Sequence, residues 1–101
     1  MKYAAIIEYT PDKAKIEQVR PTHRKYLTGL LQQGKLAAAG PFTDDSGALI
    51  VYEADTPEQA EALLKSDPFH NGGVFVRWTI RPWKAVFGKR DLFPDGGPPP
   101  L

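Results

Sequence analysis

Four stretches of the chain carry the apolar runs, or the alternation of apolar and polar residues, that are typical of β-strands. They are residues 2–9, 35–42, 48–53 and 74–83. The first is apolar except at its margins, which predicts a strand that is packed on both faces. The last alternates, so we expect one of its faces to be formed by Val74, Val76, Trp78 and Ile80.

The segment between the first two strands, residues 12–33, has the spacing of an amphipathic helix, but Pro21 interrupts it. Proline inside a helix removes a hydrogen bond and clashes with the preceding turn. We therefore expect a short first helical turn, followed by a main helix that has Pro21 near its first position. Gly34 supplies a stop for this helix. Its apolar stripe consists of His23, Leu27, Leu30 and Leu31.

A second helix is predicted between the third and fourth strands. Thr56 has the character of an N-cap, and Pro57 occupies the first helical position, where proline is tolerated. Asp67-Pro68 ends the helix, because the residue before a proline is disfavoured in the helical region. The order of elements is therefore β-α-β-β-α-β.

This order predicts an α+β ferredoxin-like sandwich, because each β-α-β unit has a right-handed crossover and residues 45–47 form a tight hairpin turn. In this fold one antiparallel sheet carries both helices on one face. We expect the opposite face to hold apolar side chains such as Tyr9 and Trp78, which a protein of 11.2 kDa does not leave exposed to water. Two such sheets packed face to face would bury them, so we expect a homodimer.

Composition narrows the classes of function. The 101 residues carry a formal net charge of +1, which gives no electrostatic reason to expect a nucleic-acid partner or binding to an anionic membrane. There is no cysteine, and the two histidines have no acidic cluster nearby, so we expect no bound metal. A glycine-rich phosphate loop is also absent, and we expect no cofactor. The chain has no signal-peptide pattern and no apolar run near the ~20 residues that span a bilayer, so a cytoplasmic location is expected.

The composition changes after residue 87. Residues 88–101 contain four prolines and three glycines and have little periodicity. Such a segment does not build a core of its own. We expect one folded domain over residues 1–87, followed by a tail or arm over residues 88–101.

One imidazole–carboxylate pair is placed by the expected architecture. His23 lies near the start of the main helix and Asp67 at the end of the second, and these two helix ends approach each other over one sheet edge in this topology. A carboxylate on one ring nitrogen fixes the tautomer of histidine and leaves the other nitrogen for a substrate. From the residues alone, the alternative is a packed structural histidine whose ring is satisfied by a capping carboxylate.

Arg20 lies one turn before this histidine and is a candidate for binding a substrate carboxylate. The alternative is a salt bridge with Asp67 or Glu17. The other basic residues of this segment, including Arg24, are interleaved with acidic ones and are expected on a solvated helix face.

Three further residues are candidates for contact with a ligand. Gly40 and Pro41 end a strand that runs close to the main helix, and the glycine indicates either a pocket wall or a plain bend. Ser46 in the hairpin loop offers a hydroxyl donor, although loop serines are mostly solvated.

Several short motifs, in this order and at these spacings, resemble the YciI-like (YCII-related) family. They are Arg20-Pro21-x-His23, Gly34-Lys35-Leu36, Ala39-Gly40-Pro41, Asp67-Pro68-Phe69, Gly73-Val74 and residues 80–87. The resemblance implies a fold of the dimeric α/β-barrel group, which includes muconolactone isomerases and small monooxygenases. It also implies that His23 and Asp67 form a catalytic dyad in a cleft. The tail after residue 87 departs from the family pattern.

Two classes of function remain open. The first is a cofactor-independent enzyme for isomerisation, lactone rearrangement or elimination on a small organic acid, with His23 as acid or base and Asp67 as its orienter. Arg20 would hold the anion. The second is a non-catalytic or stress-associated module that binds a small ligand in the same pocket. A His23 ring that faces a partly apolar cavity favours chemistry, whereas a ring with both nitrogens sealed by protein favours a structural role.

Overall fold

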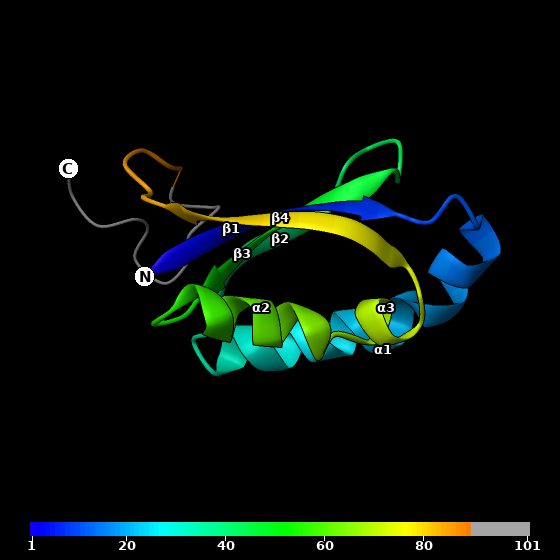
Figure 1. The fold of residues 1–101 in the computed structure, drawn as a ribbon, viewed down its shortest axis with the longest axis horizontal. Helices are drawn as coiled ribbons and strands as arrows, with labels where there is room; N and C mark the ends of the chain where they lie inside the picture. The colour runs from blue at the N-terminus through cyan, green and yellow to red at the C-terminus, as the bar shows by residue number, and fades with distance from the viewer. Residues whose placement is uncertain (90–101) are drawn as a thin grey trace.

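The computed structural model describes residues 1–89, which form one layer of helices against one sheet (Figure 1). The elements in chain order are β1 (Lys2–Tyr9), α1 (Lys13–Gln32), β2 (Leu36–Pro41), β3 (Gly47–Glu53), α2 (Pro57–Lys65), α3 (Pro68–Asn71) and β4 (Phe75–Trp83). The four strands form one sheet in the order β2-β3-β1-β4, and every neighbouring pair is antiparallel. The expected ferredoxin-like α+β sandwich is confirmed. Of the expected tail, only residues 88 and 89 fall within the described part of the chain.

The first helix differs from the expectation, because α1 is one continuous helix of 20 residues with Pro21 inside it. The expected boundary at Pro21 was wrong. An internal proline costs about 3 kcal/mol, but Ile16 before it and Leu30 after it are both buried against the sheet. Burying such side chains contributes about 1.5–3 kcal/mol each. The Asp12 side chain also caps the helix by accepting a hydrogen bond from the Lys15 amide at 3.2 Å.

The Asp67-Pro68 step does more than end the second helix. It also begins α3, a helix of four residues that the sequence did not predict. Pro68 stands at the start of α3, and the backbone of Asp67 is extended, with φ −70° and ψ 134°. That conformation follows from the proline, because the residue before a proline avoids the helical region. Asp67 is thus an N-cap, placed between α2 and α3 and beside α1.

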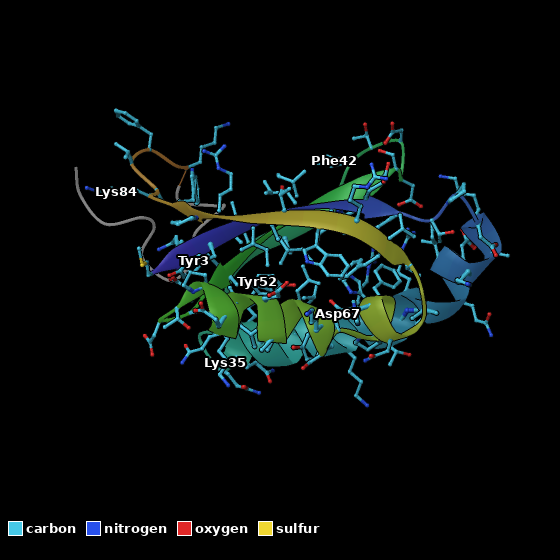
Figure 2. The ribbon with its side chains drawn as sticks, in the orientation of Figure 1. Tyr3, Lys35, Phe42, Tyr52, Asp67 and Lys84 are labelled. Carbon is cyan, nitrogen blue, oxygen red and sulfur yellow. The ribbon has the colours of Figure 1, made fainter. Side chains whose placement is uncertain are left out.

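The face of the sheet that the helices cover holds the core. It is formed by alternate residues of β1 and β3, and Tyr3 and Tyr52 are paired across these two strands. Figure 2 shows Tyr52 and Asp67 in the layer between sheet and helices. Tyr9 belongs to this layer too, since it is only 5% exposed. The expectation that Tyr9 lies on the opposite face was therefore wrong.

A β-bulge explains why the last strand also departs from simple alternation. Glu8 pairs with Arg77 but Tyr9 pairs with Phe75, so Val76 is an extra residue on β4. Val76 is 52% exposed, whereas Phe75 is buried. Trp78 is packed against the core on the helix side and not on the opposite face. An alternating pattern cannot reveal a bulge, because one inserted residue changes the face of everything beyond it.

The opposite face of the sheet exposes several apolar side chains in a single chain. Ile6 is 47% exposed and is paired across the strands with Leu49, which is 38% exposed. Trp83 on β4 is 43% exposed. Within residues 1–89, none of the helices is both long enough and apolar enough to cross a membrane.

Candidate functional site

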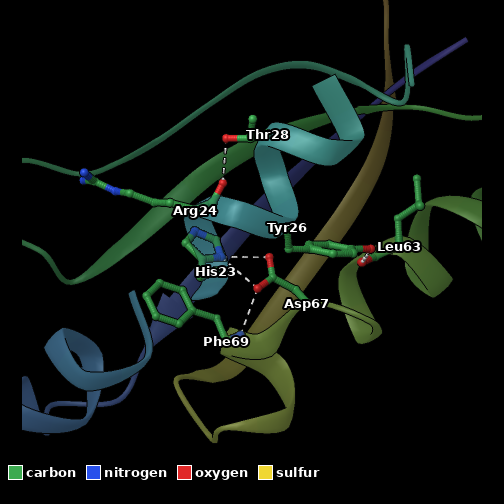
Figure 3. A network of polar contacts seen from close by, with 7 residues as sticks. All are labelled: His23, Arg24, Tyr26, Thr28, Leu63, Asp67 and Phe69. Carbon is green, nitrogen blue, oxygen red and sulfur yellow. Dashed lines mark hydrogen bonds and ion pairs between the residues drawn. The ribbon is translucent and has the colours of Figure 1, made fainter. Parts of the chain in front are cut away.

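The centre of the site is a hydrogen-bonded pair of buried polar side chains (Figure 3). His23 Nδ1 lies 2.7 Å from Asp67 Oδ1 and 2.9 Å from Oδ2. Asp67 is 0% exposed and His23 is 6% exposed. A carboxylate only accepts hydrogen bonds, so Nδ1 carries the proton and donates it. The structure therefore brings together the two residues that the sequence singled out.

The carboxylate of Asp67 is held in place by the backbone. Its Oδ1 also accepts a hydrogen bond from the amide of Phe69 at 2.8 Å, which is the capping contact of α3. The same oxygen thus serves the helix terminus and the imidazole. The cap orients the carboxylate before any ligand arrives, and this is the local consequence of the Asp67-Pro68 step.

Aromatic rings fix the plane of the imidazole. His23 stacks on Phe69 with ring centroids 3.9 Å apart and planes 11° apart. The Phe75 ring lies edge-on to it, with centroids 6.1 Å apart. Because Asp67 and these rings hold the ring on several sides, its remaining nitrogen is presented in a fixed direction. Within residues 1–89, His23 Nε2 has no hydrogen-bond partner. It is also not among the fully buried polar atoms that lack one.

A cavity of about 300 Å³ lies beside this ring, between α1 and strands β1 to β3. His23 is one of its walls, and much of the remaining wall is apolar, including Leu27, Ala48 and Ile50. This volume lies at the lower end of the range for small-molecule sites. The His23 ring thus borders a partly apolar cavity, and the protein does not enclose both of its nitrogens.

Gly40 and Pro41, from the end of β2, line this cavity together with His23. An added Cβ at Gly40 would have no atom within 4 Å, so this glycine leaves open space. Ser46 is not part of the wall. It is exposed, its carbonyl accepts a hydrogen bond from the Tyr9 amide at 2.8 Å, and its own amide donates to Asp44.

Arg20 is occupied by an acidic partner that the sequence did not suggest. Its Nη2 donates to both carboxylate oxygens of Asp45, each at 2.7 Å. The salt-bridge partner is thus neither Asp67 nor Glu17, the two that were considered. Asp45 sits at the tip of the β2–β3 hairpin with a positive φ of 61°. This ion pair ties the hairpin to α1.

Tyr9 and Arg24 belong to the cavity wall, although neither was among the site residues expected from the sequence. Tyr9 lines the cavity, and burial raises the pKa of its hydroxyl from 10.0 to about 12. It therefore stays protonated at neutral pH, as a hydrogen-bond donor. Arg24 lines the cavity as well. The helical spacing of Arg24, Leu27 and Thr28 is the signal that could have placed it there.

Side chains that could hold a metal ion do not gather at this site. Among residues 1–89 there is no group of three or more histidine, cysteine, aspartate or glutamate side chains arranged as ligands.

Comparisons with known proteins agree on the family. The YCII-related domain family matches residues 1–84. Protein YciI of Escherichia coli O6:H1 (strain CFT073) is 33% identical over 93 residues, covering 78% of this chain and 95% of that protein. The uncharacterized protein YjpA of Bacillus subtilis (strain 168) is 36% identical over 62 residues, covering 61% of this chain and 72% of YjpA.

One solved structure extends the comparison to the fold. It is the 5-chloro-2-hydroxyhydroquinone dehydrochlorinase TftG of Burkholderia phenoliruptrix AC1100, in complex with 2,5-dihydroxybenzoquinone. The TM-score is 0.72 at 23% identity, and the alignment covers 83% of this chain and 94% of TftG. At this level of identity the similarity concerns the fold.

Proposed function

The chain belongs to the YCII-related domain family, and on that premise we propose that it is a small acid–base enzyme that acts on a small organic acid without a cofactor. His23 is the acid or base, and Asp67 is its positioning residue. The observation that carries the proposal is that the two sides of the imidazole ring have different surroundings. Nδ1 is held by Asp67 at 2.7 Å, while the ring lines the cavity.

The chemistry begins at Nε2. In the neutral ring this nitrogen has the lone pair, because the proton is on Nδ1. It takes a proton from an acidic C–H or O–H of the ligand, and the ring becomes an imidazolium that the Asp67 carboxylate stabilises. In an elimination, the electrons left behind form a double bond and expel a leaving group from the neighbouring carbon. In an isomerisation, the imidazolium returns the proton to a different carbon.

Tyr9 supports this step as a donor. The electrons released by proton removal collect on a ligand oxygen, and a protonated hydroxyl in the cavity can donate a hydrogen bond to it. Burial raises the pKa of Tyr9 to about 12, so the hydroxyl keeps its proton at neutral pH.

Elimination is the first reaction to test, because TftG, whose fold is similar, is a dehydrochlorinase. The experiment measures chloride release from 5-chloro-2-hydroxyhydroquinone and, in parallel, deuterium uptake from D2O by a panel of small 2-oxo acids and lactones. We expect the wild-type protein to accelerate at least one of these reactions and His23→Gln to abolish the acceleration. Equal rates with the two proteins, or no acceleration of any member of the panel, would leave the non-catalytic binding module as the better account.

We also propose that two copies associate through the apolar sheet face. The support is the exposure of Ile6, Leu49 and Trp83 on one surface, since a small protein rarely leaves such a patch in water. Sedimentation should give a dimer at micromolar concentration. The variant Ile6→Lys, at the centre of the paired strands, should shift it to a monomer. A wild-type monomer at that concentration would contradict this proposal.

A further inference from the structure

We infer that Arg24 is the residue that selects the ligand of this cavity, and that the ligand is a small organic anion bound with its charged group at Arg24 and its reactive atom at His23. The inference rests on the proposed function, since it concerns the same cavity. It assigns the anion-binding role to a different arginine from the one that the sequence suggested.

Arg20 is poorly suited to that role in this structure. Its Nη2 already donates to both oxygens of Asp45, at 2.7 Å each, and the Arg20 and Asp45 side chains are only 25% and 29% exposed. A ligand carboxylate would have to compete with an aspartate that is covalently held beside it. Arg20 is also not part of the wall that contains His23.

Arg24 has the opposite properties. It lies in the wall of the cavity with His23, and within residues 1–89 its side chain forms no ion pair. The wall contains no acidic side chain, so the fixed charge of the cavity is that of this one guanidinium. Figure 3 shows the Arg24 side chain extending from α1 on the side away from Asp67. An anion at Arg24 would therefore not meet the negative charge of the dyad.

The shape of the cavity limits the ligand further. About 300 Å³ accommodates a single ring or a short branched chain. The apolar wall formed by Leu27, Ala48 and Ile50 suits the flat body of such a molecule. The turn that carries Arg24 is also held by Thr28, whose hydroxyl donates to the Arg24 carbonyl at 2.9 Å. The class of ligand is thus a compact carboxylate or phenolate with an apolar body.

The test uses benzoate as the probe and benzamide as its neutral counterpart, with binding followed by chemical-shift changes in NMR spectra. Arg24→Gln should weaken benzoate binding roughly tenfold or more, since a charge-assisted hydrogen bond contributes at least that factor. Arg24→Lys should retain part of the affinity. Lys25→Gln is the matched control, because it removes the same charge from the next residue of α1, which is exposed and lies outside the cavity wall.

The inference is overturned if Arg24→Gln leaves benzoate binding unchanged, or if Lys25→Gln weakens it equally. It is also overturned if benzamide binds as tightly as benzoate, or if benzoate does not bind at millimolar concentration. His23→Gln separates this result from the proposed function, because it should retain benzoate binding while it abolishes turnover. Turnover that survives His23→Gln would end the proposed function, yet loss of benzoate binding in Arg24→Gln would still support the anion site.

Discussion

Two aspartates hold two side chains of α1 that are one turn apart, and the contacts are equally short. Asp67 binds His23 at 2.7 Å, and Asp45 binds Arg20 at 2.7 Å. The first pair is buried, whereas the side chains of the second are about a quarter exposed. The first pair leaves one ring nitrogen beside a cavity, while in the second the guanidinium donates to both oxygens of the carboxylate. The two pairs thus have the same contact distance, and they differ in their surroundings, since only the His23–Asp67 pair borders the cavity.

Apart from the removal of His23 itself, Asp67→Asn should have the largest effect of any single substitution on turnover. The amide keeps a hydrogen-bond acceptor for the Phe69 amide, but it removes the charge that stabilises the imidazolium. We expect kcat to fall about 10³–10⁴-fold, as in other carboxylate-oriented histidines. The measurement is single-turnover kinetics on whichever reaction the wild-type protein accelerates. A fall of less than tenfold would make Asp67 a structural cap only.

His23→Ala tests the same pair through folding. A histidine that served only the reaction would be removable without loss of stability. The structure changes that expectation, because the substitution leaves the Asp67 carboxylate buried without its imidazole partner and removes the ring that stacks on Phe69. We expect the free energy of unfolding to drop by about 3 kcal/mol.

Urea denaturation measures this loss, and His23→Gln is the matched control because it retains a polar group near Asp67. The glutamine variant should lose less stability than the alanine variant while losing turnover completely. Equal stability of wild type and His23→Ala would mean that the pair contributes nothing to the fold.

Arg20→Gln probes the second pair, and its effects should be smaller. A partly exposed ion pair contributes up to about 1 kcal/mol and is weakened by salt. We expect a small loss of stability at low ionic strength that disappears at high ionic strength, with KM changed less than in Arg24→Gln. A KM effect larger than that of Arg24→Gln would return the anion-binding role to Arg20.

On stability, Tyr9→Phe should have the smallest effect of these substitutions, and that effect should appear only in alkali. Burial raises the pKa of Tyr9 from 10.0 to about 12, so the folded state holds this proton more tightly than the unfolded state. The resulting stabilisation is complete below pH 10 and is lost as the pH rises from about 10 to about 12. Burial also raises the pKa of Tyr52, which acts in the same direction.

Denaturation midpoints measured across this pH range should therefore fall less steeply in Tyr9→Phe than in wild type. Identical slopes would indicate that the Tyr9 hydroxyl is more accessible to solvent than the structure suggests.

Local signals predicted the order of elements, because each element depends on residues that lie close together in the sequence. Asp67-Pro68 is the clearest case, since the proline both ends α2 and sets the backbone that aims the carboxylate. His23 and Asp67 are 44 positions apart, and they were singled out through the expected topology and the family resemblance. The Arg20–Asp45 ion pair joins residues 25 positions apart, and no local pattern marks it. For the same reason, the choice between Arg20 and Arg24 could not be made from the sequence.

The residues that the sequence placed wrongly have the same explanation, because their positions depend on tertiary contacts and not on their neighbours in the sequence. Pro21 remained inside α1 because tertiary burial on both sides outweighed a local penalty. Val76 was grouped with Trp78 because the bulge is a property of strand pairing and not of the strand itself. Trp78 was assigned to the wrong face because alternation does not show which face of the sheet the helices cover. Tyr9, at the end of β1, was misplaced together with it.

The most direct test of the central claim is a ¹⁵N NMR spectrum of histidine-labelled protein, recorded with and without benzoate and assigned through the His23→Gln variant. The account predicts that His23 Nδ1 stays protonated and bonded to Asp67, while the Nε2 signal is the one that shifts when benzoate enters the cavity. A proton on Nε2 with an unprotonated Nδ1, or an Nε2 signal that does not respond to benzoate, would contradict it.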